Sequence, residues 1–204
     1  ANKEAYLFTN ASDYYDLSPT PVNPDKIRLV YHGIAHPERG LDIMVKMMDD
    51  LDERFYLDLY LVRYPEEVSK INKMARKNQR IKFCLPVKPQ NIITNANQYD
   101  IGLIFIINRM DCLPNKLFEH IQSRLMVLSI YQNEINHYIT QYDFGKDLKT
   151  YDPKQLANYL NSLTAEDIMK YKEKAHIAAK EMHNQNNEAL LKKLVSQLHN
   201  QKLV

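Results

Sequence analysis

The most apolar run in the sequence is Ile101-Gly-Leu-Ile-Phe-Ile-Ile107, which contains no polar side chain. It is far shorter than the roughly 20 apolar residues that a membrane-spanning helix needs. Unbroken apolarity over such a short length is typical of a strand that is buried on both faces. Strands of this kind occupy the centre of parallel sheets that carry helices on both sides, so the run favours an α/β fold.

Further strands are predicted on either side of this run. They are Ile27–Gly33, Phe55–Arg63, Arg80–Leu85 and Met126–Ile130. Apolar residues at helical spacing follow most of them, and the chain from Pro153 onward is predicted to be helical. Strands that alternate with helices predict a Rossmann-like, doubly wound parallel sheet, here with a helical C-terminal tail.

The domain boundary is predicted near Ile27, so that residues 27–204 form the Rossmann-like domain. Before it, Ser18–Pro24 contains three prolines, which predicts that residues 1–26 form an extended connector. Lys170–Val204 is basic and amphipathic. We expect this tail to pack its apolar stripe on the core, with peripheral contact with anionic lipid as the alternative.

Composition excludes several classes of function. A net charge of +2 is too small to indicate a protein that binds nucleic acid through its overall charge. Cys84 and Cys112 lack metal-binding spacing, and no cluster of His, Asp and Glu has ligand spacing, so neither a metal nor a cofactor is predicted. Reduced cysteines and the lack of a visible signal peptide favour a cytoplasmic protein.

The polar stretch after the apolar run is the first candidate for a site. Pro114 and Asn115 predict the start of a helix, whose free N–H groups favour an anion such as phosphate. Glu119 lies about one turn into that helix and leans back toward the same end. It could accept hydrogen bonds from the two hydroxyls of a ribose joined to the phosphate. It could equally be a residue that complements the helix dipole and binds no ligand.

Several segments carry a resemblance to a known family. Seven residues separate Asp111 from Glu119, and Pro114-Asn-Lys-Leu-Phe-Glu-His120 resembles the donor-site segment of GT-B-fold, nucleotide-sugar-dependent retaining glycosyltransferases of the glycosyl transferases group 1 type. Arg39-Gly-Leu-Asp42 and Gln98-Tyr-Asp100 resemble two further segments of that family, in the same order. The resemblance runs from about Ile27 to Leu163 and concerns the C-terminal, donor-binding half.

The resemblance implies roles for particular residues. Glu119 would hold the ribose hydroxyls, and Asp111 would face the transferred sugar as the catalytic carboxylate. The remaining substrate-binding residues that it implies are Gly33, Arg63, Asn115, Lys116 and Leu117. Among the basic residues, Arg63 after the second strand is preferred to Arg39 as the ligand of the diphosphate.

The function that the resemblance implies is transfer of a sugar, with retention and without a bound metal, from a nucleotide-diphosphate sugar to a glycan or lipid-linked acceptor. Synthesis of bacterial surface polysaccharide is the expected setting, in the cytoplasm or at the inner face of the membrane. An acceptor-binding half cannot fit into residues 1–26. We therefore expect a fragment that binds a nucleotide without turning over.

Two alternatives remain open at this point. Asp111 is one methylene shorter than the glutamate of the family, and the sequence has only four glycines. Both features suit a non-catalytic Rossmann-like binding or interaction domain. The second alternative is one half of an epimerase of nucleotide sugars.

His32, at the end of the first strand, is expected to make a local hydrogen bond rather than to contact a ligand.

Overall fold

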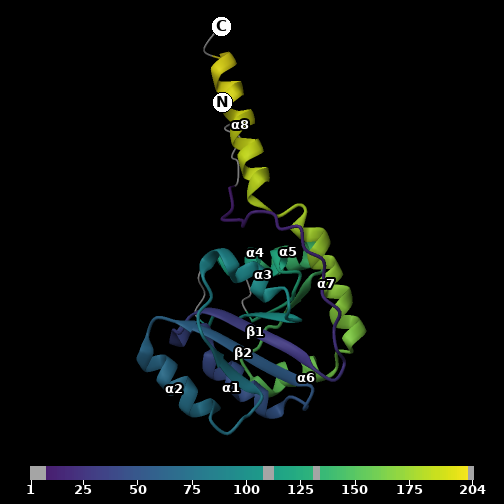
Figure 1. Ribbon diagram of the computed structural model, residues 1–204. Coiled ribbons are helices and arrows are strands. Elements are labelled where there is room, and N and C mark those ends of the chain that lie inside the picture. The colour runs from purple at the N-terminus through teal and green to yellow at the C-terminus, as the bar shows by residue number, and fades with distance from the viewer. Residues whose placement is uncertain (1–7, 108–112, 131–133, 202–204) are drawn as a thin grey trace.

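The computed structural model describes residues 8–107, 113–130 and 134–201. Within these ranges the chain forms a six-stranded, fully parallel sheet in the order β3-β2-β1-β4-β5-β6 (Figure 1). Its strands are β1 (Ile27–Ile34), β2 (Phe55–Val62), β3 (Ile81–Cys84), β4 (Ile101–Ile104), β5 (Met126–Ser129) and β6 (Gly145–Asp147). This order is that of a doubly wound Rossmann-like sheet, as the sequence predicted.

Helices cover both faces of the sheet (Figure 1). The elements on one face are α1 (Leu41–Asp50), α2 (Pro65–Ala75) and α6 (Pro153–Asn161), with the short η1 (Pro37–Arg39) leading into α1. Those on the other face are η2 (Pro89–Asn91), α3 (Ile92–Ala96), α4 (Asn115–Gln122) and α5 (Glu134–Tyr142). The helix α7 (Ala165–Ala179) begins in the core of the first face and ends in that of the second.

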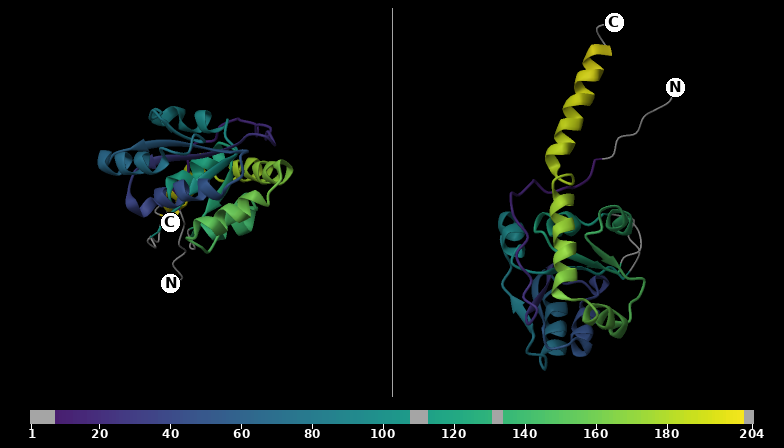
Figure 2. Two further views of the ribbon diagram at one scale, coloured as in Figure 1. Left: turned by 90° about the horizontal axis from the view of Figure 1, so that it is seen from below. Right: turned by 90° about the vertical axis from the view of Figure 1, so that its right-hand side faces the viewer.

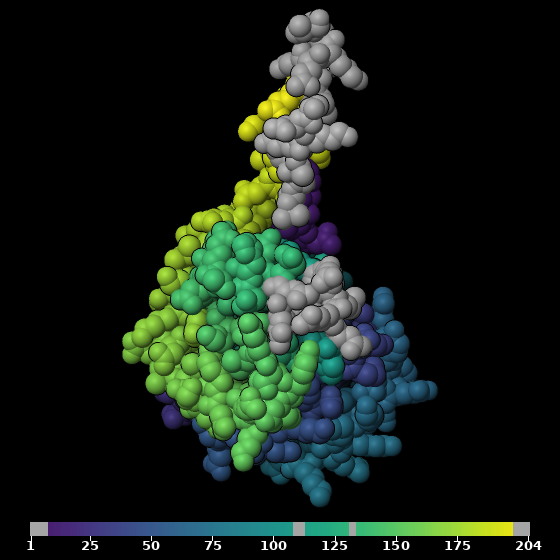
Figure 3. Space-filling view, turned by 180° about the vertical axis from the view of Figure 1, so that it is seen from behind, coloured from purple at the N-terminus to yellow at the C-terminus, as the bar shows by residue number. Residues whose placement is uncertain are grey.

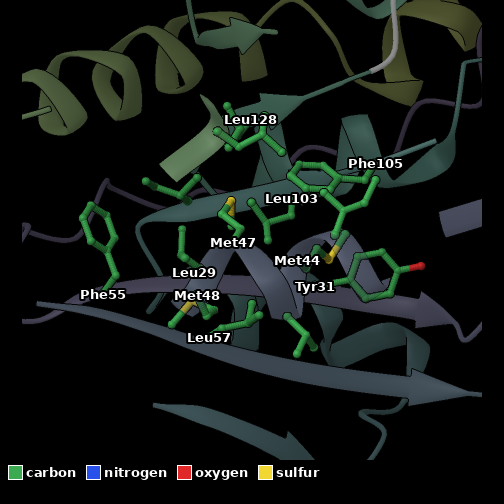
Figure 4. Packing of buried hydrophobic residues seen from close by; sticks show 14 of the residues in the cluster. Leu29, Tyr31, Met44, Met47, Met48, Phe55, Leu57, Leu103, Phe105 and Leu128 are labelled. Atoms are coloured by element: carbon green, nitrogen blue, oxygen red, sulfur yellow. The ribbon is translucent and has the colours of Figure 1, made fainter. Parts of the chain in front are cut away.

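The larger part of the core lies between α1 and the central strands (Figure 4). Met44, Met47 and Met48 of α1 are fully buried there against strand residues such as Leu29 and Leu57. Every residue of β4 and β5 is buried, which confirms the predicted central position of the apolar run. The strand β4 is shorter than the predicted run, because its pairing with the neighbouring strands ends at Ile104. The N–H of Ile107 instead donates to the carbonyl of Glu38.

The N-terminal segment of residues 8–26 runs along the outside of the domain beside α7 (Figure 2). It is held there by long-range hydrogen bonds. Arg124 donates to the carbonyls of Tyr15 and Leu17, and the buried Lys172 donates to the hydroxyl of Thr20. The role of residues 1–26 as a connector stays a prediction.

The helical tail behaves differently in its two parts. Ala175, Ala178 and Ala179 of α7 are fully buried, as expected for a tail that packs on the core. The following helix, α8 (Asn184–Gln201), projects away from the body of the molecule (Figure 3), and its Leu191 and Val195 are more than half exposed. The expectation of packing is therefore wrong for α8. This helix extends past the sheet and past the helices that cover the sheet, so Leu191 and Val195 do not reach the core. In the described ranges, no helix is both long and apolar enough to span a membrane.

Candidate functional site

The candidate site lies where β1 and β4 are neighbours at the centre of the sheet. The connections after these two strands leave toward opposite faces, so their carboxyl ends border a crevice, the usual ligand position in such sheets. A hollow of about 370 Å³ opens there. We call it the central hollow; its lining residues are Tyr31, His32, Gly33, Ile34, Arg39, Ile92, Ile104, Phe105, Ile106, Pro114, Asn115, Lys116 and Glu119.

The N-terminus of α4 borders the central hollow. Pro114 occupies the N-cap position, and no side chain caps the helix. Asn115 was predicted as a possible cap but is the first residue of the helix, and it is exposed. The N–H of Leu117 donates to the carbonyl of Pro114, whereas the side chain of Leu117 is buried in the core. The backbone at Asn115 and Lys116 therefore offers the site the partial positive charge of a helix N-terminus.

Lys116 crosses the central hollow toward β1. Its Nζ lies 3.6 Å from the centroid of the Tyr31 ring. A Cβ atom added to Gly33, where φ is +130°, would lie 3.4 Å from the same Nζ, so glycine suits both the backbone conformation and the close approach. Burial, together with the positive charge of Arg39, lowers the pKa of Lys116 to about 7. This lysine can therefore gain or lose a proton near neutral pH.

Glu119 lies one turn further along α4 and is half-buried. Its Oε2 is 3.6 Å from Nε2 of His32, which is too long for a hydrogen bond. Burial raises the pKa of Glu119, and the charge of Lys116 acts in the opposite direction. The carboxyl group thus stands between a lysine on its own helix and a histidine on β1.

His32 and His120 form a buried pair beneath this carboxyl group. Their ring centroids are 5.0 Å apart and the rings are edge-on. Burial, with the charge of Lys116, lowers the pKa of His32 to about 3, and burial also lowers the pKa of His120. The Nε2 of His32 has no hydrogen-bond partner among the described residues, so the local hydrogen bond expected there is not formed by that nitrogen.

His120 is fully buried, which the sequence analysis did not predict. The cause is the glycine in the apolar run, because a Cβ atom at Gly102 would lie 2.6–2.7 Å from the His120 ring. Glycine in a central strand commonly marks such a close approach. A glycine inside an otherwise apolar run was therefore the one available signal.

The two candidate arginines occupy different places. Arg39 lines the central hollow, although the sequence favoured Arg63. Arg63 follows β2 with a left-handed φ of 60°, is exposed, and is not part of the lining. Asp111, the predicted catalytic carboxylate, lies outside the described residues. In the ranges that are described, no group of three His, Cys, Asp or Glu side chains could hold a metal ion.

A second hollow of about 200 Å³ adjoins the first and shares His32, Gly33 and Ile92 with it. Its other lining residues are mostly apolar: Val30, Tyr60, Val62, Pro86, Val87, Pro89, Asn95 and Ala96. The second hollow thus offers an apolar surface beside the central hollow, which carries the charged side chains of Arg39, Lys116 and Glu119. That division suits a ligand with an aromatic end and an anionic end.

No protein-family model and no curated protein matches the chain by sequence. Solved structures match it by fold. WaaG, a glycosyltransferase involved in lipopolysaccharide biosynthesis, has a TM-score of 0.67 at 18% identity, over 82% of this chain and 47% of WaaG. HepE from Anabaena, in complex with UDP and glucose, has a TM-score of 0.72 at 12% identity, over 84% and 49% of the two chains. The fold is that of one half of a GT-B glycosyltransferase.

Sucrose-phosphate synthase from Thermosynechococcus elongatus gives the same result, with a TM-score of 0.73 at 11% identity. The match covers 88% of this chain and 47% of the synthase. The chain thus spans about half the length of these three structures. At these identities the likeness is one of fold, and the chemistry must be argued from the residues of this chain.

Proposed function

We propose that this domain is the donor-binding half of a retaining glycosyltransferase that uses a nucleotide-diphosphate sugar. The observation that carries the proposal is the position of α4. Its uncapped N-terminus, with Lys116 and Glu119, faces the crevice between β1 and β4. The apolar second hollow adjoins it. A nucleoside diphosphate has a base, a ribose and two phosphates. The second hollow would take the base, and the central hollow would take the ribose at Glu119 and the phosphates at the N-terminus of α4.

The diphosphate would lie at the N-terminus of α4. Backbone N–H groups at Asn115 and Lys116, together with the Lys116 ammonium, would stabilise the charge that develops on the leaving group. Arg39 lines the same hollow and is the second cation that we assign to the diphosphate. Arg63 remains a prediction, since it would have to reach in from its exposed position after β2.

The nucleoside would occupy the remaining space. Glu119 would accept hydrogen bonds from the two ribose hydroxyls, and the base would lie in the second hollow among residues such as Val87 and Pro89. Asp111 would face the transferred sugar. The glycan or lipid-linked acceptor would be bound by an acceptor-binding half, and bacterial surface polysaccharide is the proposed product. That HepE was crystallised with UDP-glucose and that WaaG acts in lipopolysaccharide biosynthesis support this assignment.

The test is isothermal titration with uridine, guanosine, cytidine and adenosine diphosphates. We expect one of them to bind selectively, and Glu119→Gln to weaken that binding roughly 10- to 100-fold, because charge-assisted hydrogen bonds contribute about 1.5–3 kcal/mol each. Arg39→Ala should weaken binding of the nucleoside diphosphate more than binding of the nucleoside, with Arg63→Ala as the matched comparison. Binding of none of the four nucleotides by the intact domain would reject the proposal.

A further inference from the structure

The Nε2 atom of His32 stands beside Glu119 without a hydrogen-bond partner among the described residues. It is 9% exposed, at the carboxyl end of β1. Its Nε2 is buried, makes no hydrogen bond to any described residue, and lies 3.6 Å from Oε2 of Glu119. Buried ring nitrogens are rarely left without a partner, so an unpaired one at this distance from a carboxyl group calls for an explanation.

The protonation state of His32 follows from its neighbours. Lys116, Glu119 and His120, all on α4, face its ring. Burial and the charge of Lys116 lower the pKa of His32 to about 3, so the ring is neutral at pH 7 and carries one proton. An ionised carboxylate has only acceptors, so a lone pair on Nε2 would repel it. When Glu119 is ionised, the tautomer with its proton on Nε2 is the one that can donate to it.

We propose that His32 is a positioning residue for Glu119. Its Nε2–H would hold Oε2, so that the other lone pairs of the carboxylate face the central hollow and accept both ribose hydroxyls. This inference rests on the proposed function. A shift of about half an ångström brings the two atoms into hydrogen-bond range. Long hydrogen bonds that tighten when the ligand arrives are common in unliganded sites.

The proposal separates recognition of the ribose from recognition of the diphosphate. Glu119 acts on the sugar hydroxyls, whereas Lys116 and the N-terminus of α4 act on the phosphates. Loss of the His32 donor should thus affect a ribonucleotide and leave inorganic pyrophosphate unaffected. A 2′-deoxyribonucleotide should be affected less than the ribonucleotide, because it offers Glu119 one hydroxyl fewer.

The experiment compares three variants by isothermal titration. His32→Leu removes the donor, His32→Gln retains an N–H at a similar reach, and His36→Asn is the matched control on the neighbouring loop. The probes are the nucleoside diphosphate of the panel that binds most tightly, its 2′-deoxy analogue, and pyrophosphate. We expect His32→Leu to weaken the ribonucleotide about tenfold, from the loss of one charge-assisted hydrogen bond. Pyrophosphate affinity should stay unchanged, and His32→Gln should recover most of the loss.

An equal loss for pyrophosphate, or no loss for the ribonucleotide, would overturn the role of His32 while leaving the proposed function intact. Failure of the wild-type domain to bind any nucleotide would reject the proposed function. The ring itself is examined separately, by long-range 1H–15N spectra of the unliganded domain at pH 7. A proton on Nε2 alone supports the proposal, and a proton on Nδ1 alone or on both nitrogens overturns it without reference to a nucleotide.

Discussion

Arg124 is a fully buried cation in a left-handed backbone conformation, with φ of 60°. Its guanidinium donates to the carbonyls of Tyr15 and Leu17 in the N-terminal segment and to that of Gln122 at the end of α4. It also donates to Nδ1 of His176 in α7, over 3.0 Å. One side chain thus joins three separate parts of the chain, at the expense of a backbone conformation that favours glycine.

Two substitutions separate the stabilising hydrogen bonds of Arg124 from the strain of its left-handed backbone. Arg124→Ala removes the guanidinium, its hydrogen bonds and its buried stem, but keeps a Cβ atom on the left-handed backbone. We expect it to lower the free energy of unfolding by roughly 3–5 kcal/mol, from the loss of charge-assisted hydrogen bonds and the cavity that the missing side chain leaves. Arg124→Gly loses the same hydrogen bonds and the same buried stem as the alanine variant but relieves the left-handed conformation, which costs other residues about 1–2 kcal/mol. The glycine variant should therefore be the more stable of the two by about that amount.

The assay is urea denaturation followed by circular dichroism, since the chain contains no tryptophan. Limited proteolysis within residues 8–17 reports release of the N-terminal segment. The predicted order of stability is wild type, then Arg124→Gly, then Arg124→Ala. Equal midpoints for the two variants would show that the left-handed residue stores no strain. A loss below about 1 kcal/mol in both would refute the stabilising role of the guanidinium network.

Two other predictions concern the site and the core. With its pKa near 7, Lys116 is protonated at pH 6.5 and largely neutral at pH 8.5, so affinity for a nucleoside diphosphate should fall by up to about 20-fold over that range. Lys116→Arg should flatten this profile in the same titrations. Gly102→Ala should lower the free energy of unfolding by roughly 1–3 kcal/mol, because its Cβ would overlap the buried His120 ring. An unchanged urea midpoint would contradict that overlap.

The elements that sequence patterns predicted well are those whose periodicity follows from burial. The run at Ile101 is apolar throughout because β4 is buried on both faces. The residues of β2 alternate because one face of that strand is buried more deeply than the other. The segment β6 was not predicted, because three residues with an exposed lysine in the middle carry no such pattern. Its strand conformation comes from pairing with β5, which is a tertiary effect.

The candidate site was predictable in part. Pro114 and Asn115 indicated the start of α4, and Glu119 was placed correctly one turn inside it. The position of Arg39 in the central hollow could not be inferred from the sequence, because η1 turns the chain back toward α4 only in three dimensions. The orientation of His32 was likewise undetermined, since it depends on packing against a helix far away in the sequence.

The helix α4 is a short, rigid element that links the central hollow to the N-terminal segment. Its N-terminal end borders the central hollow with Lys116 and Glu119. At its other end, the side chain of Gln122 accepts from the N–H of Tyr15 and donates to the carbonyl of Ala179 at the end of α7. Eight helical residues span only about 12 Å. A pull on the N-terminal segment would therefore act on the same rigid body that carries the lysine and the carboxylate, and would move both together.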